Sequence, residues 1–282
     1  MTNKYATPFS LLHAVSLLSH RQRIAKFAMV IERIVKPRDY VIDIGSGSGI
    51  LAILAAKQGA QVTAVEINEE SLRYAERAAE VNGVADQIEF VAMNILEYSP
   101  TELADVVMCE MLSSMMLIEQ QIPVSSFAVE KLLKPLGKII PNSIQIFAVP
   151  VQTEILWNRF MVQELSFPRV PQTIEKTQYT DFADLAKVAS FDLTIPNRNP
   201  VVDKILSFKM IDEGLVHGLV GMFSSKLYED VILNMNDGWR ELFIPLDEPV
   251  KVAKGDILSI GLFYRPGEIN SLNLKIIETS DV

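Results

Sequence analysis

The chain contains little cysteine and histidine, and this scarcity excludes several classes of protein. Cys109 is the single cysteine among 282 residues, and there are three histidines. One cysteine cannot form a disulfide within the chain, so we expect a reducing, cytoplasmic environment. No group of cysteine and histidine residues has the spacing of metal ligands, so the sequence predicts no metal site.

Long apolar runs and an excess of positive charge are also missing. No uninterrupted apolar stretch is long enough to cross a bilayer, and residues 1–5 do not begin a signal peptide, so no membrane association is expected. The 26 basic residues are outnumbered by 35 acidic ones, which gives a net charge of −9. This balance argues against a nucleic-acid partner and leaves a basic protein or a small molecule as the expected partner.

What the chain does have is apolar residues, which make up 49% of its sequence. That share is sufficient for a proper core and excludes a disordered chain. A length of 282 residues exceeds what one α/β core needs. We therefore predict one large domain and one smaller domain.

A glycine-rich stretch organises the first half of the chain. Residues 41–44 are mostly apolar and β-branched, as expected of a buried parallel strand. Gly45, Gly47 and Gly49 follow at alternate positions, and residues 50–56 favour a helix. Glycine reaches positive φ at low cost and lets a ligand approach the backbone, while the first N–H groups of the helix point at that ligand. The pattern predicts the nucleotide-binding corner of an open α/β sheet.

Two acidic residues refine this prediction. Asp43 ends the buried strand and needs partners there, either a ligand ammonium or backbone amides of the turn. Glu66 ends the next predicted strand, 21 residues after Gly45, where a carboxylate accepts hydrogen bonds from ribose hydroxyls. The alternative for Glu66 is a solvated strand end. Ile50 replaces the third glycine of the dinucleotide pattern, which argues against a dehydrogenase.

Residues 43–51, followed by residues 64–68, resemble the cofactor-binding half of class I S-adenosylmethionine-dependent methyltransferases. The resemblance implies S-adenosyl-L-methionine as cofactor, with an acidic partner for its ammonium. It implies that Asn94 and Ile95 hold the adenine, although Asn94 could equally be a turn residue. The cofactor-binding residues that we predict on this basis are Asp43, Gly45, Ser46, Gly47, Gly49, Glu66, Ile67, Asn94 and Ile95.

The pattern changes character near residue 143. Strands and helices alternate up to residue 140, which predicts a doubly wound, mostly parallel Rossmann-like sheet. From residue 143 onward short strands and turns predominate, which predicts a β-barrel or β-sandwich domain. We therefore divide the chain into domains 1–142 and 143–282. A polar and aromatic insert at about 152–188 separates the first two strands of the second domain.

The N-terminal region predicts a helix over about residues 10–35, with Arg23 on its polar side. Its position on the helix, taken alone, favours a solvent-exposed side chain for Arg23. The protein arginine methyltransferase family, however, carries an acid-x-x-arginine pair on the helix before the glycine turn. The resemblance implies that Arg23 holds the cofactor carboxylate. His20 stands where the family has the acid.

Two glutamates predict the catalytic site. Glu110 follows the fourth predicted strand, at the edge where open α/β sheets bind ligands, and Glu119 comes nine residues later. The pair resembles the double-glutamate loop of protein arginine methyltransferases, in which two carboxylates orient a guanidinium. The alternatives are a helix-capping role for Glu110 and a surface position for Glu119.

The resemblance continues through the second half of the chain. Residues 215–220, which include His217, resemble a barrel strand of the family, although a histidine there is more often a core residue. Residues 237–243 resemble its T-H-W loop, with Gly238 at the position of the histidine. The insert at 152–188 falls where the family has a dimerisation arm, which implies a homodimer.

We predict an S-adenosylmethionine-dependent methyltransferase whose leading acceptor is a protein arginine, with Glu110 and Glu119 as catalytic residues. A small molecule is the second acceptor, and loss of the T-H-W histidine favours it. The third hypothesis is a cofactor-binding protein without transferase activity.

Overall fold

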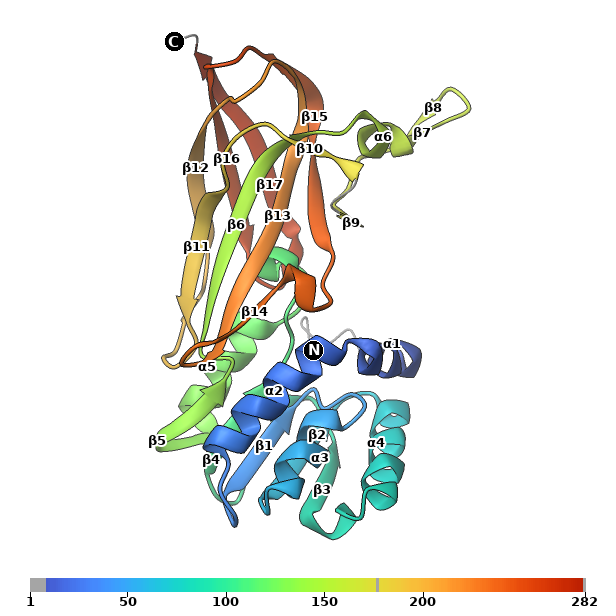
Figure 1. Cartoon of the computed structure of the whole chain (residues 1–282), viewed down its shortest axis with the longest axis vertical. Coiled ribbons are helices and arrows are strands. Elements are labelled where there is room, and N and C mark those ends of the chain that lie inside the picture. The colour runs from blue at the N-terminus through green and yellow to red at the C-terminus, as the bar shows by residue number, and fades with distance from the viewer. Residues whose placement is uncertain (1–8, 176–177, 281–282) are drawn as a thin grey trace.

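The computed structural model describes residues 9–175 and 178–280. Its first half contains a five-stranded parallel sheet with the strand order β3-β2-β1-β4-β5 (Figure 1). The order changes direction at β1 and β4, so the carboxyl end of β1 lies at the position where open α/β sheets bind ligands. The predicted doubly wound sheet is confirmed. Its strands are β1 Tyr40–Ile44, β2 Gln61–Glu66, β3 Ile88–Ala92, β4 Ala104–Cys109 and β5 Leu133–Ile140.

Helices connect these strands much as the sequence predicts. Asn68 caps α4, Glu69–Val81, because its side chain accepts hydrogen bonds from the N–H groups of Glu70 and Ser71. The three central strands, β2, β1 and β4, are buried along most of their length, which explains their nearly continuous apolar runs. The other connecting elements are α3 Ile50–Lys57, α5 Gln121–Lys131, and the short 3-10 helices η2 Ala85–Gln87, η3 Ile95–Glu97 and η4 Ser114–Met116.

The N-terminal region differs from the single helix that the sequence predicts. It consists of α1 Leu11–Ser16, η1 Leu17–Ser19 and α2 Arg21–Ile34, with the break at His20 (φ −79°, ψ 69°). The hydroxyl of Ser16 donates to the carbonyl of His13, and the hydroxyl of Ser19 donates to that of Ser16. Such local bonds compete with helical hydrogen bonding, which accounts for the break. His20 therefore becomes the N-cap residue of a separate α2.

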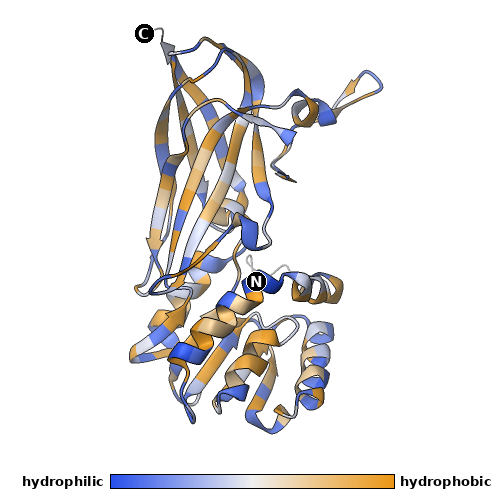
Figure 2. Cartoon of the chain, in the orientation of Figure 1, coloured by the Kyte–Doolittle hydropathy of each residue, from blue (hydrophilic) through white to orange (hydrophobic). Residues whose placement is uncertain are grey.

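The second half consists of two antiparallel sheets. One is built around β6, β13 and β15, and the other has the order β12-β16-β17. The sheets curl toward each other (Figure 1), and no strand pair joins them within the described ranges. Of the predicted barrel and sandwich, the domain therefore has the form of a curled, open half-barrel. Apolar and polar residues alternate along the strands (Figure 2). The strands are β6 Ser143–Gln152, β11 Ala186–Asp192, β12 Val202–Lys209, β13 Gly214–Tyr228, β14 Val231–Asn234, β15 Glu241–Val252, β16 Ile257–Arg265 and β17 Glu268–Ser280.

The insert forms a small projecting arm. The two-residue strands β7 and β8 pair as a hairpin that extends away from the rest of the β-domain (Figure 1). Other parts of the insert belong to the large sheet, because β9 pairs with β15 and β10 pairs with β6. The elements are α6 Glu154–Trp157, η5 Asn158–Phe160, β7 Met161–Val162, β8 Leu165–Ser166, β9 Gln172–Ile174 and β10 Thr180–Asp181.

Helix α2 lies between the two halves (Figure 1). Lys26 on this helix forms an ion pair of 2.7 Å with the buried Asp237 in η7, Met235–Asp237. From the other direction, the hydroxyl of the buried Tyr264 in β16 donates to the carbonyl of Met115 in η4. The two halves are therefore joined through α2 and through the segment between β4 and α5, which follows the carboxyl end of β4.

None of the helices in residues 9–175 and 178–280 combines the length and the apolar character needed to cross a membrane. Residues 1–5, where the sequence predicts no export signal, lie outside the described residues.

Candidate active site

The glycine turn has the conformation that its sequence predicts. Gly45, Gly47 and Gly49 have φ values of 67°, 53° and 78°, which L-residues with side chains rarely adopt. A Cβ on Gly49 would lie 2.8 Å from the Cβ of Ala75 in α4, and one on Gly45 would lie 2.8 Å from the Cε of Met111. The turn therefore requires glycine for packing as well as for backbone conformation.

Asp43 is almost fully buried at the end of β1. Its carboxylate accepts a hydrogen bond of 3.0 Å from the N–H of Ala52, in the first turn of α3. Of the two kinds of partner that the sequence leaves open, a backbone amide is therefore present, although it belongs to the helix that follows the turn. Burial raises the pKa of Asp43 to about 7, the Ala52 hydrogen bond opposes the increase, and the charge of Glu66 adds to it.

Glu66 lies beside the glycine turn at the end of β2. One carboxylate oxygen accepts from the N–H of Gly47 at 2.9 Å, and the other accepts from that of Asn68 at 2.8 Å. A carboxylate has about four acceptor positions, so both oxygens can also accept hydroxyl groups. The buried hydroxyl of Ser46, on the same turn, has no hydrogen-bond partner among the described residues. Such an atom fits a polar ligand at this place.

The predicted adenine site shows both expected and unexpected features. The Oδ1 of Asn94 accepts from the N–H of Leu96 and caps η3, which is the turn role that the sequence left open. The side chain of Ile95 is buried in the core and is not available as an exposed surface for a base. At this edge Ile67 and Met93, each 39% exposed, present apolar surface instead.

Arg23 lies among the residues that the sequence predicts for the acceptor. Its guanidinium forms an ion pair with the carboxylate of Glu110, and both side chains are largely buried. The same guanidinium lies 4.6 Å from the ring centroid of Trp239, at a distance suited to a cation–π contact. Burial lowers the pKa of Arg23 to about 10, and the charge of Glu119 opposes that decrease. The structure thus brings together Arg23, which the sequence assigns to the cofactor, and Glu110 and Glu119, which it assigns to the acceptor.

Glu119 is held by the loop that separates it from Glu110. The hydroxyl of Ser113 accepts hydrogen bonds from the N–H groups of Ile118 and Glu119, at 3.3 and 3.1 Å. The fully buried Gln121 accepts from the N–H of Met111 at 2.8 Å. Burial raises the pKa of Glu119 to about 7, and the charge of Arg23 opposes the increase. The sequence does not predict these roles of Ser113 and Gln121, because they depend on backbone partners that a side-chain motif does not reveal.

The middle of this loop has an unusual backbone. Met115 and Met116 are fully buried and have φ values of 58° and 53°, a conformation that non-glycine residues adopt only when surrounding contacts compensate for its cost. One such contact is Gly221 in β13, where any Cβ would overlap the side chain of Met115. A second is the indole of Trp239, which donates to the carbonyl of Leu112 at 2.8 Å. The β-domain therefore holds the loop in place.

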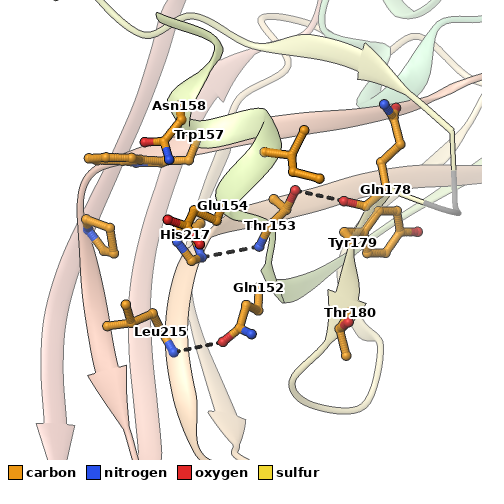
Figure 3. A pocket seen from close by; sticks show the side chains of 12 residues that line it. Gln152, Thr153, Glu154, Trp157, Asn158, Gln178, Tyr179, Thr180, Leu215 and His217 are labelled. Carbon is orange, nitrogen blue, oxygen red and sulfur yellow. Dashed lines mark hydrogen bonds between the residues drawn. The ribbon is translucent and has the colours of Figure 1, made fainter. Parts of the chain in front are cut away.

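A separate pocket of about 620 Å³ lies at the base of the arm (Figure 3). It is lined by residues of α6, β10 and β13, including Thr153 and His217. The N–H of Thr153 donates to the Nδ1 of the buried His217, whose pKa is lowered by burial. None of the predicted catalytic or cofactor-binding residues lines this pocket. His217 itself is a buried residue of the β-domain, as its strand position suggested.

No group of three or more potential metal ligands occurs in the described part of the chain. Cys109 is buried without a disulfide, and burial raises its pKa to about 12, so its thiol is not reactive.

Two family models match the chain, one for each half. Residues 27–141 match the family described as ribosomal protein L11 methyltransferase, and residues 143–267 match the PRMT5 oligomerisation domain. The first match includes the glycine turn, Glu66 and Glu110, and the second includes the arm and Trp239.

Relatives match over most of the chain. A protein of Methanocaldococcus jannaschii, named Uncharacterized protein MJ1452, is 41% identical over 93% of this chain and 95% of its own length. An arginine N(omega)-methyltransferase of Streptomyces achromogenes is 24% identical, over 88% of this chain and 74% of its own length. Protein arginine N-methyltransferase 6 of Xenopus tropicalis is 23% identical, over 84% and 78% respectively.

A solved structure has the same fold. It is the Trypanosoma brucei PRMT1 enzyme-prozyme heterotetrameric complex with AdoHcy, with a TM-score of 0.78 and 22% identity over 92% of this chain and 91% of that one. Together with the two family models, these matches define the class of protein: an S-adenosylmethionine-dependent methyltransferase. The chain belongs to the family of MJ1452 and is built like the protein arginine methyltransferases.

The site fits S-adenosylmethionine as cofactor. The Glu66 carboxylate, the unpartnered Ser46 hydroxyl and the buried Asp43 surround a turn that presents no positive charge for a phosphate. These groups suit hydroxyl and ammonium partners.

Replacing Glu66 tests this assignment. We expect Glu66→Ala to weaken S-adenosylmethionine binding by about 10- to 100-fold, because two charge-assisted hydrogen bonds are worth about 1.5–3 kcal/mol. Isothermal titration calorimetry measures the affinity, and Glu76→Ala on the exposed side of α4 is the control. Unchanged affinity, or tighter binding of NAD than of S-adenosylmethionine, would contradict the assignment.

Proposed function

We propose that this chain transfers the methyl group of S-adenosylmethionine to the guanidinium of an arginine residue in a protein, with Glu110 and Glu119 as its catalytic residues. The observation that carries the proposal is the environment of Arg23. A guanidinium already lies against Glu110, within electrostatic reach of Glu119 and over the ring of Trp239. Two carboxylates and an aromatic ring form an environment that suits a planar cation.

Each residue has a distinct role in this proposal. Glu66 binds the ribose, Asp43 offsets the ammonium, and Arg23 turns from Glu110 to the cofactor carboxylate. Glu110 is then free to accept the acceptor guanidinium together with Glu119, and the two carboxylates leave one nitrogen aimed at the methyl group. The bound cofactor supplies an electrophilic methyl on a sulfonium. Trp239 keeps the loop in position through its hydrogen bond to Leu112.

An acceptor assay tests the proposal. The protein is incubated with methyl-labelled S-adenosylmethionine and, separately, with an arginine-rich protein, its lysine-substituted counterpart and free arginine. We expect label on the arginine-rich protein and none on the lysine form, with methylarginine identified by mass spectrometry. Label on the lysine form alone, or cofactor binding with no product from any acceptor, would contradict it.

Free arginine is the second candidate acceptor. One relative is named an arginine N(omega)-methyltransferase, without reference to protein, and Gly238 replaces the histidine of the T-H-W pattern. The same two carboxylates would bind either guanidinium. Label on free arginine alone would favour this candidate.

We assign residues 1–142 to the cofactor domain and residues 143–282 to the acceptor domain. The arm of the second domain supports a homodimer. Trp157, an aromatic residue of the insert, packs into the β-domain rather than on the arm surface, and its indole donates to the carbonyl of Leu246. Exposed apolar side chains occur on the hairpin and just after it, at Met161, Val162, Leu165 and Phe167. This small, projecting apolar surface is suited to contact with another protein.

Substituting these side chains tests the dimer. We expect the wild-type protein to be a dimer at micromolar concentration and a variant carrying Met161→Ser, Leu165→Ser and Phe167→Ser to be a monomer. Light scattering gives the mass, and Ile205→Ser, which removes an exposed apolar side chain from β12, is the control. A monomeric wild-type protein would contradict the proposal. Deleting the whole insert is less informative, because β9 and β10 belong to the large sheet.

A further inference from the structure

Two departures from the family pattern, His20 and Gly238, are adjacent in the structure although 218 positions separate them in the sequence. An ideal Cβ on Gly238 would lie 2.5 Å from Nδ1, 2.6 Å from Cγ and 3.1 Å from Cβ of His20. Two of these atoms are at the base of the side chain, so rotation of the ring cannot relieve the overlap. His20 thus fills the space that any side chain at position 238 would need.

The contacts on either side of this pair lead into the candidate active site. His20 is the N-cap residue of α2, and Arg23, three positions later, lies on the same face of the helix. Gly238 directly precedes Trp239, whose ring lies over Arg23 and whose indole N–H donates to the carbonyl of Leu112. The imidazole therefore lies where α2 meets the polypeptide that carries Trp239.

The hydrogen-bonding state of His20 is also unusual. Its Nδ1 is buried and has no hydrogen-bond partner in the described part of the chain, and the side chain does not cap α2. Burial lowers the pKa of His20, and the charge of Arg23 lowers it further. Among the described residues, His13 on α1 is a titratable neighbour, and Asp237, which precedes Gly238, forms an ion pair with Lys26. An unpartnered buried nitrogen has a cost, which indicates that the ring is retained for its shape and position.

We propose that His20 is a positioning residue of the active site: packed on Gly238, it holds Trp239 against Arg23 and thereby orders the loop between Glu110 and Glu119. The proposal explains why both departures occur in one chain. A histidine at position 20 requires glycine at position 238. Any larger residue at position 238 would displace the neighbouring Trp239 while His20 is present. This positioning role rests on the proposed function only for the identity of the methyl acceptor.

A double-mutant cycle tests the steric half of the proposal. The variants are His20→Ala, Gly238→Ala and the double variant, with Gly255→Ala as the control. Gly238 and Gly255 have positive φ values of 126° and 99°, but a Cβ on Gly255 meets nothing within 4 Å. The control therefore measures the backbone cost alone. We expect Gly238→Ala to lower the melting temperature more than Gly255→Ala. We expect most of this excess to disappear in the His20→Ala background, because alanine removes Nδ1 and Cγ and leaves only the Cβ, 3.1 Å away. Equal costs for the two glycines, or additive effects in the double variant, would overturn the proposal.

The functional half is measured by turnover, cofactor affinity and the fluorescence of Trp239 in a Trp157→Phe background. We expect His20→Ala to shift the Trp239 emission and to lower turnover by about 10-fold or more through the loosened loop. The His20→Asp/Gly238→His variant carries the family residues at both positions and should exceed each of its single variants in turnover. Unchanged emission and turnover in His20→Ala would overturn the proposal. The emission and melting measurements need no acceptor, so they distinguish failure here from failure of the arginine assignment.

Discussion

Glu110→Gln is expected to reduce methyl transfer by about 100-fold or more while leaving S-adenosylmethionine affinity unchanged or increased. Glutamine keeps the size of the side chain and one acceptor oxygen but loses the charge that orients a cationic acceptor. In the present structure Glu110 also forms an ion pair with Arg23. Removing its charge frees Arg23 for the cofactor carboxylate, so cofactor binding should not suffer. Steady-state turnover and calorimetry measure the two quantities.

The control for this variant is Glu76→Gln, which changes an exposed glutamate on α4. Loss of cofactor binding together with turnover would indicate a structural defect, and near-normal turnover in Glu110→Gln would remove Glu110 from the catalytic site. A neutral acceptor would also give a small effect, because the charge would then matter less. The acceptor assay separates that outcome from an incorrect site assignment.

Glu119→Gln extends the same prediction with a dependence on pH. The pKa of Glu119 is raised to about 7, so its carboxylate is largely protonated at pH 6 and largely ionised at pH 8. An ionised Glu119 binds a guanidinium and a protonated one does not. The ratio of wild-type to Glu119→Gln turnover should therefore rise with pH through about 7. A constant ratio would show that this charge does not act on the acceptor.

The sequence predicts the cofactor half of the molecule well because its signals are local. Residues 41–56 contain a strand, a glycine turn and a helix start within one continuous segment, and Asn68 caps its helix through residues two and three positions away. The short apolar runs and turns after residue 143 likewise predict that the second half consists mainly of strands. Such features depend on neighbours in the chain, and a single sequence displays them.

What the sequence could not predict depends on distant partners. Trp239 reaches Leu112 across 127 positions, and Gly221 is required by Met115 across 106. The burial of Ile95 and the packing of Trp157 depend on the same long-range folding. The break at His20 was missed because an apolar helical periodicity continues through it, while the serine hydroxyls that interrupt the helix bond to the backbone. The sequence shows His20 and Gly238 as separate departures from the family pattern, and only the fold brings them into contact.

Asp43→Asn should have opposite effects on stability and on cofactor binding. The pKa of Asp43 is raised from its ordinary value of 3.8 to about 7 in the folded protein. The folded state therefore prefers the protonated form, and the stability associated with that preference is lost as pH rises from about 4 through about 7. Asparagine carries no charge and can still accept from the N–H of Ala52. Without cofactor, we expect Asp43→Asn to exceed the wild type in stability by about 1–2 kcal/mol at pH 8, with little difference at pH 4.

Cofactor binding should move in the other direction, because the proposed role of Asp43 is to offset the cofactor ammonium. We expect Asp43→Asn to weaken S-adenosylmethionine binding by about 10- to 100-fold at pH 8. Since the ammonium favours the ionised carboxylate, wild-type affinity should rise with pH through about 7, whereas that of Asp43→Asn should change little. Thermal melts and calorimetry at several pH values measure both effects, with Asp86→Asn as an exposed control. A variant that gains stability at pH 8 but keeps full cofactor affinity would show that Asp43 does not face the ammonium, and that its buried charge is balanced through the N-terminus of α3 instead.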